Sequence, residues 1–296
     1  MSTKVKDLLA DVERKFNATE LSALAAYFRT VMFETLHKSQ TGHWGGAASS
    51  AELTTALYFN RMKIDAKNPT WEDRDRLILS KGHASMNLYT MLAHRGYFPV
   101  EELETFRKLN SRLQGHPSMT STPGVDMSTG ALGHGLSIGV GMALAARLSK
   151  KDFWTYVVSG EGCLNEGQSW EAMMSAAKYK PEGLVLMIDY NKVQLDGTEE
   201  EIMPLAPLAD KLVSFGWNVA PKAYDGHDTA AILESFDWMD SDNVWPKAVI
   251  YDTVKGKGIS FTEDQSAWHG AVIDEDSYAK GIVELRKDLE EKEAAL

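Results

Sequence analysis

The chain has 296 residues, enough for one large domain or two small ones. Its 31 Lys and Arg against 42 Asp and Glu give a formal net charge of −11, which disfavours nucleic acid and membrane surfaces as partners. Hydrophobic residues make up 44% and charged residues 25%, the composition of a folded globular protein. The single cysteine, Cys163, excludes an internal disulfide and a cysteine zinc site, so a reducing, cytoplasmic location is expected.

The amino-terminal residues 1–16 carry a charge every few positions and lack the apolar core of a secretory signal, so export is not expected. The most apolar stretch, residues 131–148, contains His134, Arg147 and four glycines, which predicts a buried helix and not a membrane span. A helix rich in Glu and Lys is predicted at the carboxyl terminus. Because no repeat or flexible linker is visible, residues 1–296 are expected to form a single domain with an amino-terminal helical segment.

Short apolar runs separated by segments with helical periodicity indicate the fold class. The runs that predict strands are residues 77–79, 156–158, 184–188 and 248–251. This alternation predicts an α/β fold in which helices cover both faces of a parallel sheet. Small and polar residues follow the first three runs, at 80–83, 159–162 and 189–191. Because ligands bind at the carboxyl ends of such strands, these segments are expected to meet at one crevice.

Two of these strand ends carry oxygen ligands suited to a divalent cation. In the first, Glu161 lies between Gly160 and Gly162, where bare backbone approaches an anion closely and the carboxylate can hold a cation that bridges to phosphate. In the second, Asn191 supplies an amide oxygen and Val193 a main-chain carbonyl. Taken alone, the glycine pattern fits an ordinary strand-to-helix turn, but the two loops together predict a clamp for a cation and a diphosphate.

Six of the eight histidines have a glycine as a neighbour in the sequence, and for five of these the expectation is that several line one polar cavity. The five are His43, His83, His116, His134 and His269. Neutral imidazoles can donate to diphosphate oxygens or move protons to and from sugar hydroxyls near neutral pH. Gly130 and Leu132, in the turn before a helix rich in small residues, would present main-chain groups and an apolar side chain to a flat heterocycle.

Because these motifs follow one another in the same order, the chain resembles the amino-terminal, thiamine-diphosphate-binding half of transketolase. More narrowly, it resembles the separate amino-terminal subunit of split transketolases. The resemblance covers nearly the whole chain. Matching segments include residues 42–43, 74–76, 79–84, 113–117, 128–130, 160–162, 167–172, 189–191, 225–228, 253–258 and 267–270. Single triplets are generic, but their order and spacing together are specific to the family.

The resemblance implies a role for particular residues. The metal ligands, for Mg²⁺ or Ca²⁺, would be Glu161, Asn191 and the carbonyl of Val193. Groups around the diphosphate would be His83, Gly162 and His269, and those facing the sugar would be His43, His116 and His269. The cofactor rings would lie between Gly130, Leu132 and Leu195, and Glu166 would join an inter-subunit network near the cofactor.

Two positions depart from the family pattern. The metal motif normally begins Gly-Asp-Gly, and here Glu161 is one methylene longer, so its carboxylate must fold back or shift the ion. The residue after His43 is usually proline, and here it is Trp44. An indole beside a substrate-facing histidine would reshape the pocket and change the choice of sugar; alternatively, Trp44 packs against a neighbour.

The resemblance also implies a partner. In the family, a glutamate of the pyrimidine-binding domain activates the cofactor, and a chain ending at Leu296 has no room for that domain. A carboxy-terminal subunit is therefore expected to supply it, within a heterotetramer that transfers a two-carbon unit from a ketose, phosphorylated or otherwise anionic, to an aldose. The alternatives are the amino-terminal part of a deoxyxylulose-phosphate-synthase-like enzyme and a non-catalytic regulatory relative. A histidine-based metal hydrolase ranks last, because no HExxH motif is present.

Overall fold

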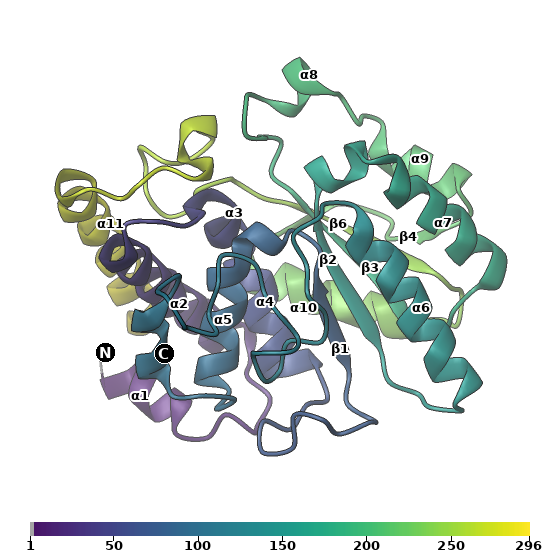
Figure 1. Cartoon of the computed structure of the whole chain (residues 1–296), viewed down its shortest axis with the longest axis horizontal. Helices are drawn as coiled ribbons and strands as arrows, with labels where there is room; N and C mark the ends of the chain where they lie inside the picture. The colour runs from purple at the N-terminus through teal and green to yellow at the C-terminus, as the bar shows by residue number, and fades with distance from the viewer. Residues whose placement is uncertain (1–2) are drawn as a thin grey trace.

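The computed structural model describes residues 3–296 (Figure 1). Within that range one parallel sheet has the strand order β1-β2-β3-β6-β4, and β5 also pairs with β6. The strands are β1 (Arg76–Leu79), β2 (Thr155–Gly160), β3 (Leu184–Tyr190), β4 (Asn218–Val219), β5 (Tyr224–Asp225) and β6 (Lys247–Asp252). All four predicted strands are present. The other two, β4 and β5, are too short to leave a pattern in the sequence.

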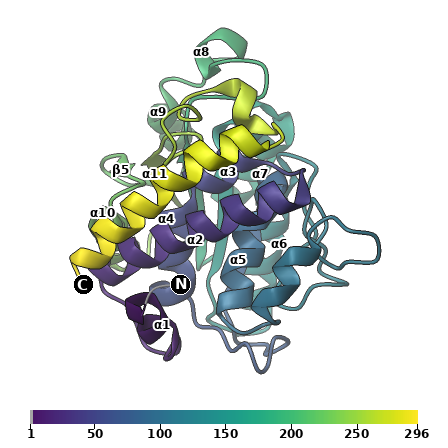
Figure 2. The ribbon, with the colours of Figure 1, turned by 90° about the vertical axis from the view of Figure 1, so that its left-hand side faces the viewer.

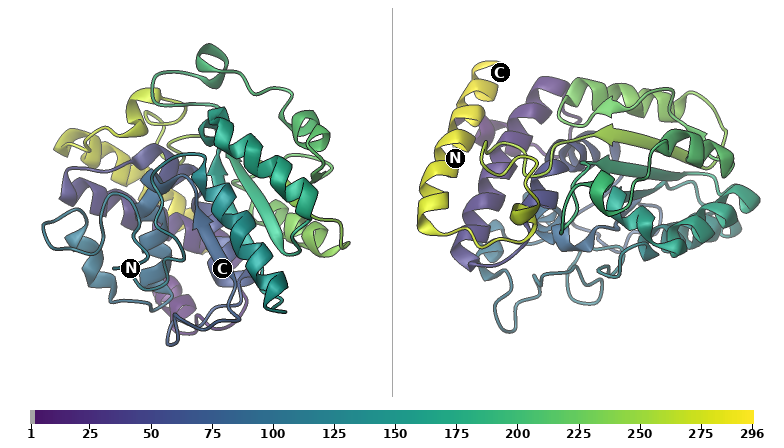
Figure 3. Two further views of the ribbon diagram at one scale, coloured as in Figure 1. Left: turned by 45° about the vertical axis from the view of Figure 1, so that its right-hand side comes forward. Right: turned by 90° about the horizontal axis from the view of Figure 1, so that it is seen from above.

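Alternating side chains of the strands face two separate hydrophobic layers, and Figure 3 shows the sheet between its helices. Leu77, Tyr156 and Val185 pack under the first layer, whereas Ile78, Val157 and Leu186 pack under the second. The first layer contains α2 (Ala18–Ser39), α3 (Trp44–Ser49), α4 (Ala51–Ala56), α5 (Ser85–His94) and α10 (Thr229–Asp240). The second contains α6 (His134–Leu148), α7 (Gly167–Tyr179) and α9 (Leu208–Ser214). The predicted α/β architecture is confirmed.

The carboxy-terminal helix α11 (Glu275–Ala294) lies beside α2, so segments far apart in the sequence pack together (Figure 2). Its buried residues include Ile282 and Leu285. A Cβ atom on Gly281 would lie 2.8 Å from the Phe33 ring, so only glycine permits this close approach. The remaining elements are α1 (Thr3–Leu9), α8 (Glu199–Ile202), the π-helical turn η1 (Leu57–Arg61) and the 3-10 turns η2 (Gly82–Ala84), η3 (Val100–Thr105), η4 (Glu161–Asn165) and η5 (Ser266–His269).

Helix α6 is buried on one side only. Leu136 and Val140 pack toward the sheet, and a Cβ atom on Gly139 would lie 2.5 Å from Val157 Cγ2, so the helix lies very close to β2. Leu148, in contrast, is 82% exposed. The prediction of a buried helix over 131–148 is therefore correct for the inner face and wrong for the outer one. Across residues 3–296, every helix is too short or too polar to cross a membrane.

A buried ion pair connects α2 and α4 to the loop before α10. Arg29 Nη2 lies 2.6 Å from Glu52 Oε1, and both residues are buried. His227 accepts from the Val254 N–H at Nε2, so Nδ1 carries the ring proton and donates to Glu52 Oε2 at 3.2 Å. Burial would raise the pKa of Glu52, but Arg29 and His227 outweigh it and hold that pKa at about 2.

Replacing Glu52 with glutamine is expected to lower the free energy of unfolding at pH 7 by about 3 kcal/mol, because Arg29 loses its buried partner. The folded pKa lies below the unfolded value of 4.5, so this stabilisation is complete above about pH 5 and is lost as the pH falls toward 2. Urea unfolding at several pH values measures it. The difference between wild type and variant should shrink in acid, and a difference that stays constant down to pH 3 would contradict the assignment.

Candidate active site

The carboxyl ends of the central strands surround one cavity of about 200 Å³. Its walls include the segments after β1, β2, β3 and β6, and the first three of these are the segments that the sequence places at one crevice. The lining residues are Gly46, Lys81, His83, Leu132, Gly160, Glu161, Gly162, Cys163, Asn191, Val193, Gln194, Leu195, Lys255 and His269. Eight predicted site residues therefore line a single cavity, although they come from widely separated parts of the chain.

Three histidines form a cluster at this cavity. His43 is the N-cap residue of α3, His83 lies in η2, and His269 ends η5. The ring centroids of His83 and His269 are 4.8 Å apart and the rings are stacked. The His43 ring is 5.3 Å from that of His83 and 5.4 Å from that of His269. The expectation that several of the glycine-flanked histidines come together is met by these three.

His116 lies beside this cluster. Gly130 has a φ of +149°, and a Cβ atom there would lie 3.0 Å from the His116 ring, so glycine is required where the ring crosses the turn. The Arg107 guanidinium lies between this region and His43, with Nη2 3.5 Å from His43 Nδ1. A Cβ on Gly115 would lie 2.4 Å from Arg107 Nη2. His134, by contrast, is exposed at the start of α6.

The histidines of this region are held in the neutral form. Burial, followed by nearby positive charges, lowers the pKa of His43 to about 4, of His83 to about 2 and of His269 to about 3. Burial and then Arg107 also lower the pKa of His116. Neutral rings suit donation to and acceptance from a ligand, as expected. Because their pKa values are lowered, these environments do not favour a proton shuttle that uses the charged imidazolium near neutral pH.

The predicted metal ligands are adjacent to one another. The Asn191 main-chain N–H donates to Glu161 Oε2 at 3.3 Å, and the Val193 N–H donates to Asn191 Oδ1 at 3.3 Å. Glu161 is 2% exposed, and burial followed by the nearby Asp189 raises its pKa to about 7. Its carboxylate thus contacts the main chain of the loop after β3.

Asp189, at the end of β3, organises the floor of this site; it belongs to a polar segment predicted to lie at the crevice, but no role was predicted for it. Its carboxylate accepts from Ser49 Oγ at 2.7 Å and Thr253 Oγ1 at 2.6 Å, and it forms a buried ion pair with Lys81. It also accepts from Asn191 Nδ2 at 3.1 Å, which turns the amide oxygen Oδ1 of Asn191 away from it. Burial would raise the pKa of Asp189, but Lys81 outweighs it and keeps the carboxylate charged.

The residues present fit a divalent cation. Glu161 is a buried carboxyl group without a cationic partner within 4 Å in the part of the chain described, and the amide of Asn191 and the carbonyl of Val193 add hard oxygen donors. Residues 3–296 contain no cluster of three His, Cys, Asp or Glu suited to a metal, so such a site depends on amide and main-chain oxygens. The remaining ligands would come from a diphosphate and water.

The expected ring contacts lie at the mouth of the cavity. Leu132 is 37% and Leu195 is 60% exposed, although both line it. Gly162 is half-buried, next to Gln194. Glu166 is the exposed N-cap residue of α7, and its side chain packs against Gly133, where a Cβ would lie 2.6 Å from Glu166 Cβ. Because Leu132, Leu195 and Glu166 are exposed, the site is open on this side.

Trp44 does not enter the cavity. It is fully buried, its Nε1 donates to Thr262 Oγ1 at 3.0 Å, and its ring packs edge-on against Phe33 at 4.9 Å. The packing alternative is therefore confirmed, and the idea that the indole reshapes the pocket is wrong. His43, one residue earlier, is the N-cap residue of α3, and its ring lies 5.3 Å from that of His83.

Replacing Trp44 with phenylalanine is expected to lower the free energy of unfolding by about 1–3 kcal/mol, since the core loses volume and Thr262 loses its donor. The ratio of kcat/KM values for two ketose donors should stay within about twofold, because the indole touches no ligand. Urea unfolding and steady-state kinetics of the complete enzyme measure the two effects. A large change in donor preference without a loss of stability would contradict this placement.

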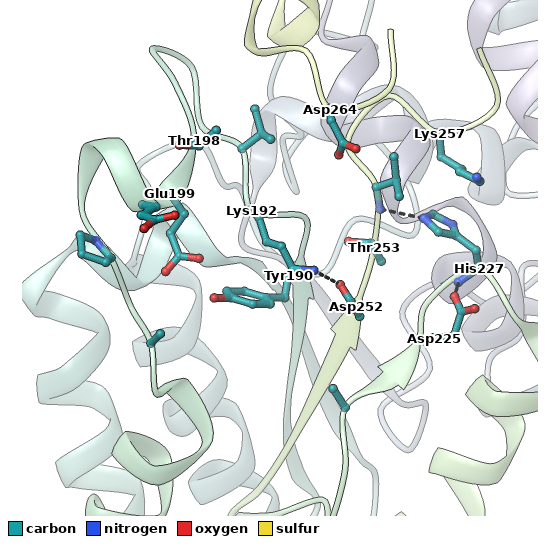
Figure 4. A pocket seen from close by; sticks show the side chains of 16 residues that line it. Tyr190, Lys192, Thr198, Glu199, Asp225, His227, Asp252, Thr253, Lys257 and Asp264 are labelled. Carbon is teal, nitrogen blue, oxygen red and sulfur yellow. Dashed lines mark hydrogen bonds and ion pairs between the residues drawn. The ribbon is translucent and has the colours of Figure 1, made fainter. Parts of the chain in front are cut away.

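A larger cavity of about 1030 Å³ lies beside the first, between the α8 region and the end of β6 (Figure 4). Some of its polar groups are already paired: Lys192 Nζ lies 2.5 Å from Asp252 Oδ1, and the Asp225 carboxylate accepts from the main-chain N–H of His227 at 2.8 Å. None of the predicted ligands except Val193 lines it. Size alone therefore does not make it the candidate site.

A parallel sheet with oxygen ligands and neutral histidines at the carboxyl ends of its strands belongs to the class of α/β domains that bind phosphorylated cofactors. The family described as "Transketolase, thiamine diphosphate binding domain" matches residues 21–290. The chain belongs to the transketolase family, and this domain of it binds thiamine diphosphate.

Two relatives are similar over almost their whole length. The chain is 42% identical, over 91% of its own length and 97% of the relative's, to the 6-deoxy-6-sulfo-D-fructose transketolase subunit SqwG of Clostridium sp. (strain MSTE9). It is 39% identical, over 90% of its length and 93% of the relative's, to one of the subunits of the apulose-4-phosphate transketolase of Phocaeicola vulgatus. The chain is thus of the type found as one subunit of a divided transketolase.

Solved transketolases share the fold. The chain superposes on the transketolase of Campylobacter jejuni with a TM-score of 0.85 and 28% identity over 95% of its residues. It superposes on the Pichia stipitis enzyme in complex with sedoheptulose-7-phosphate with a TM-score of 0.83 and 30% identity. It spans 46% and 44% of those two chains, so somewhat less than half of each enzyme is represented here.

Proposed function

We propose that this chain is the cofactor-binding subunit of a two-chain transketolase, which transfers a two-carbon ketol unit from an anionic ketose to an aldose. The observation that carries the proposal is the single cavity where Glu161, Asn191 and the Val193 carbonyl lie beside His83 and His269. Thiamine diphosphate, when bound, supplies the electron sink for the carbanion formed as the donor's carbon–carbon bond breaks.

The residues of the chain have separate tasks in this proposal. Glu161, Asn191 and Val193 would hold a divalent cation, Mg²⁺ or Ca²⁺, whose charge would attract the diphosphate, and His83, Gly162 and His269 would donate to the phosphate oxygens. Gly130, Leu132 and Leu195 provide the surface on which the rings rest. His43, His116 and His269 bind the sugar oxygens as neutral donors and acceptors of hydrogen bonds.

The proposal includes a second polypeptide. The cavity is open beside Leu132, Leu195 and Glu166, and the chain matches less than half of the solved transketolases. A carboxy-terminal subunit with a pyrimidine-binding domain would cover this side, in a heterotetramer, and Glu166 would contact it. Residues 1–296 act in that assembly as one thiamine-diphosphate-binding unit.

The substrate class is proposed to be anionic sugars. One relative is named for a sulfonated sugar and the other for a sugar phosphate, so both names specify an anion. Arg107, half-buried beside His43, has no carboxylate within 4 Å in residues 3–296, which leaves this side of the site positively charged. Which anion is preferred depends also on the partner's residues.

An activity assay with and without the partner subunit tests the proposal. The purified chain is combined with thiamine diphosphate, Mg²⁺, an anionic ketose and an aldose acceptor, with and without the partner subunit, and ketol transfer is followed by chromatography of the sugars. Turnover is expected only when both chains are present. Robust turnover by this chain alone would overturn the two-chain assignment. Absence of cofactor binding in the mixture would instead support a regulatory relative.

A further inference from the structure

His227 is the sixth histidine with a glycine neighbour, and no role has been given to it although its segment, residues 225–228, matches the family. Its ring is not among the groups that line the candidate active-site cavity. It lies instead between the larger cavity of Figure 4 and a further cavity of about 500 Å³ lined by residues of α2 and α11. Its side chain is only 13% exposed, so its position is set by contacts within the protein.

The segment that carries His227 closes over the carboxyl end of β6. The Gly226 N–H donates to the Asp252 carbonyl at 2.8 Å, and a Cβ atom on Gly226 would lie 2.3 Å from Thr253 Cγ2. Only glycine permits so close an approach. The Asp225 carboxylate accepts from the His227 N–H and fixes the turn. The imidazole is therefore held over the main chain just beyond the strand.

At this point His227 takes the place of a strand. Pairing on both sides of β6 stops at Asp252, which lies opposite Tyr190 of β3 and Asp225 of β5. Beyond it, the Val254 N–H donates to His227 Nε2 at 2.8 Å and not to a strand carbonyl. The ring nitrogen thus supplies the acceptor that a longer neighbouring strand would have supplied. The hold on the main chain is extended by two residues past the end of β6.

The main chain held in this way leads to the candidate active site. Thr253 Oγ1 donates to Asp189 Oδ1 at 2.6 Å, at the floor of the site. Lys255 lines the cavity, whereas Val254, between the two, lines the larger cavity of Figure 4. A displacement of the main chain at Val254 would consequently move both neighbours relative to the cavity.

We propose that His227 is a positioning residue of the active site, which accepts the Val254 N–H and so holds residues 253–255 in place at the floor of the cavity. His227 touches neither the cavity nor a ligand in it, and acts only through the main chain. The expected consequence for cofactor affinity rests on the proposed function. The contact between His227 and Val254 does not.

The ring makes two contacts through two different nitrogens, and amide side chains can replace them one at a time. Nδ1–H donates to Glu52 Oε2 at 3.2 Å, and Nε2 accepts from Val254. The amide nitrogen of asparagine occupies the position of Nδ1, and the amide oxygen of glutamine reaches the position of Nε2. His227→Gln therefore keeps the contact with Val254, whereas His227→Asn keeps only the contact with Glu52.

Hydrogen exchange of the full chain at pH 7 without ligand, read by NMR at the Val254 amide, tests the contact itself. The amide should be protected in the wild type and in His227→Gln. In His227→Asn, it is expected to exchange at least about tenfold faster, because its acceptor is missing. Equal protection of this amide in His227→Asn and the wild type, in protein with wild-type circular dichroism, would overturn the proposal.

Calorimetry with thiamine diphosphate and Mg²⁺ in the presence of the partner subunit tests the consequence. His227→Asn is expected to bind the cofactor about 10–100-fold more weakly than the wild type, and His227→Gln is expected to stay closer to it. Wild-type affinity in His227→Asn, or equal losses in the two variants, would contradict a role that runs through Val254.

Asp228→Ala is the matched control for a general loss of stability. The Asp228 side chain caps α10 by accepting from the Ala230 N–H at 2.9 Å, and it makes no contact with Val254. Its removal should lower the stability and leave the cofactor affinity unchanged. A loss of affinity as large as that of His227→Asn would refute the proposal. If the wild type binds no thiamine diphosphate, the proposed function fails, and the exchange of Val254 still decides the role of His227.

Discussion

Replacing Glu161 with glutamine is expected to lower the Mg²⁺-dependent affinity for thiamine diphosphate by at least about 100-fold. Glu161 is the only carboxyl group among the three predicted ligands, since Asn191 and Val193 contribute neutral oxygens. Removing its charge takes away the main electrostatic attraction for a divalent cation, while the nearly identical shape of glutamine preserves the packing. Calorimetric titration of the chain with its partner, in Mg²⁺ and in EDTA, measures the effect.

Glu171→Gln is the matched control, because Glu171 is an exposed acid on α7 outside the cavity. Its affinity for the cofactor should equal that of the wild type. In EDTA the Glu161→Gln and wild-type proteins should bind equally weakly, because the missing interaction runs through the metal. Wild-type affinity of Glu161→Gln in Mg²⁺ would show that this carboxylate is not a ligand.

Replacing Lys81 with methionine is expected to lower the free energy of unfolding by about 3–5 kcal/mol. Lys81 is 2% exposed and Asp189 is fully buried, so the variant leaves a carboxylate in the interior without its ion pair. Ser49, Thr253 and Asn191 still donate to Asp189, but none of them is charged. Urea unfolding followed by circular dichroism gives the free energy.

Lys151→Met provides the comparison, because Lys151 pairs with Glu72 and Asp73 at the surface. The Lys151→Met variant should lose less than about 1 kcal/mol of unfolding free energy. Adding Asp189→Asn to Lys81→Met should recover part of the lost stability, since no unpaired charge then remains buried. Equal costs for Lys81→Met and Lys151→Met would mean that the buried pair contributes nothing beyond a surface pair.

Sequence patterns predicted the strands and the crevice because both depend on local signals. Four apolar runs correspond to four strands, and each of the three polar segments that follow them contributes residues to the lining of the cavity. His43, His83 and His269 are together, as their glycine-rich contexts suggested, because bare backbone is needed where three loops converge. His134 has the same context but begins an exposed helix, so glycine neighbours alone do not define the group.

Contacts between distant segments were not predictable in this way. Lys81, Asp189 and Lys255 come from the ends of three different strands, and nothing in their local sequence says that a lysine will be buried against a carboxylate or a histidine ring. The direction of Trp44 was equally open, because the first residue of α3 can face either the cavity or Phe33. Phe33 also stacks on Tyr278 of α11, so contacts between segments far apart in the sequence fix the direction of Trp44.

A crystal structure of the chain with thiamine diphosphate and Mn²⁺ tests the central claim most directly, because the anomalous signal locates the metal without ambiguity. The account predicts a peak about 2 Å from a Glu161 carboxylate oxygen, Asn191 Oδ1 and the Val193 carbonyl, with the diphosphate beside His83 and His269. A metal peak elsewhere, or a diphosphate seated in the larger cavity of Figure 4, would contradict it.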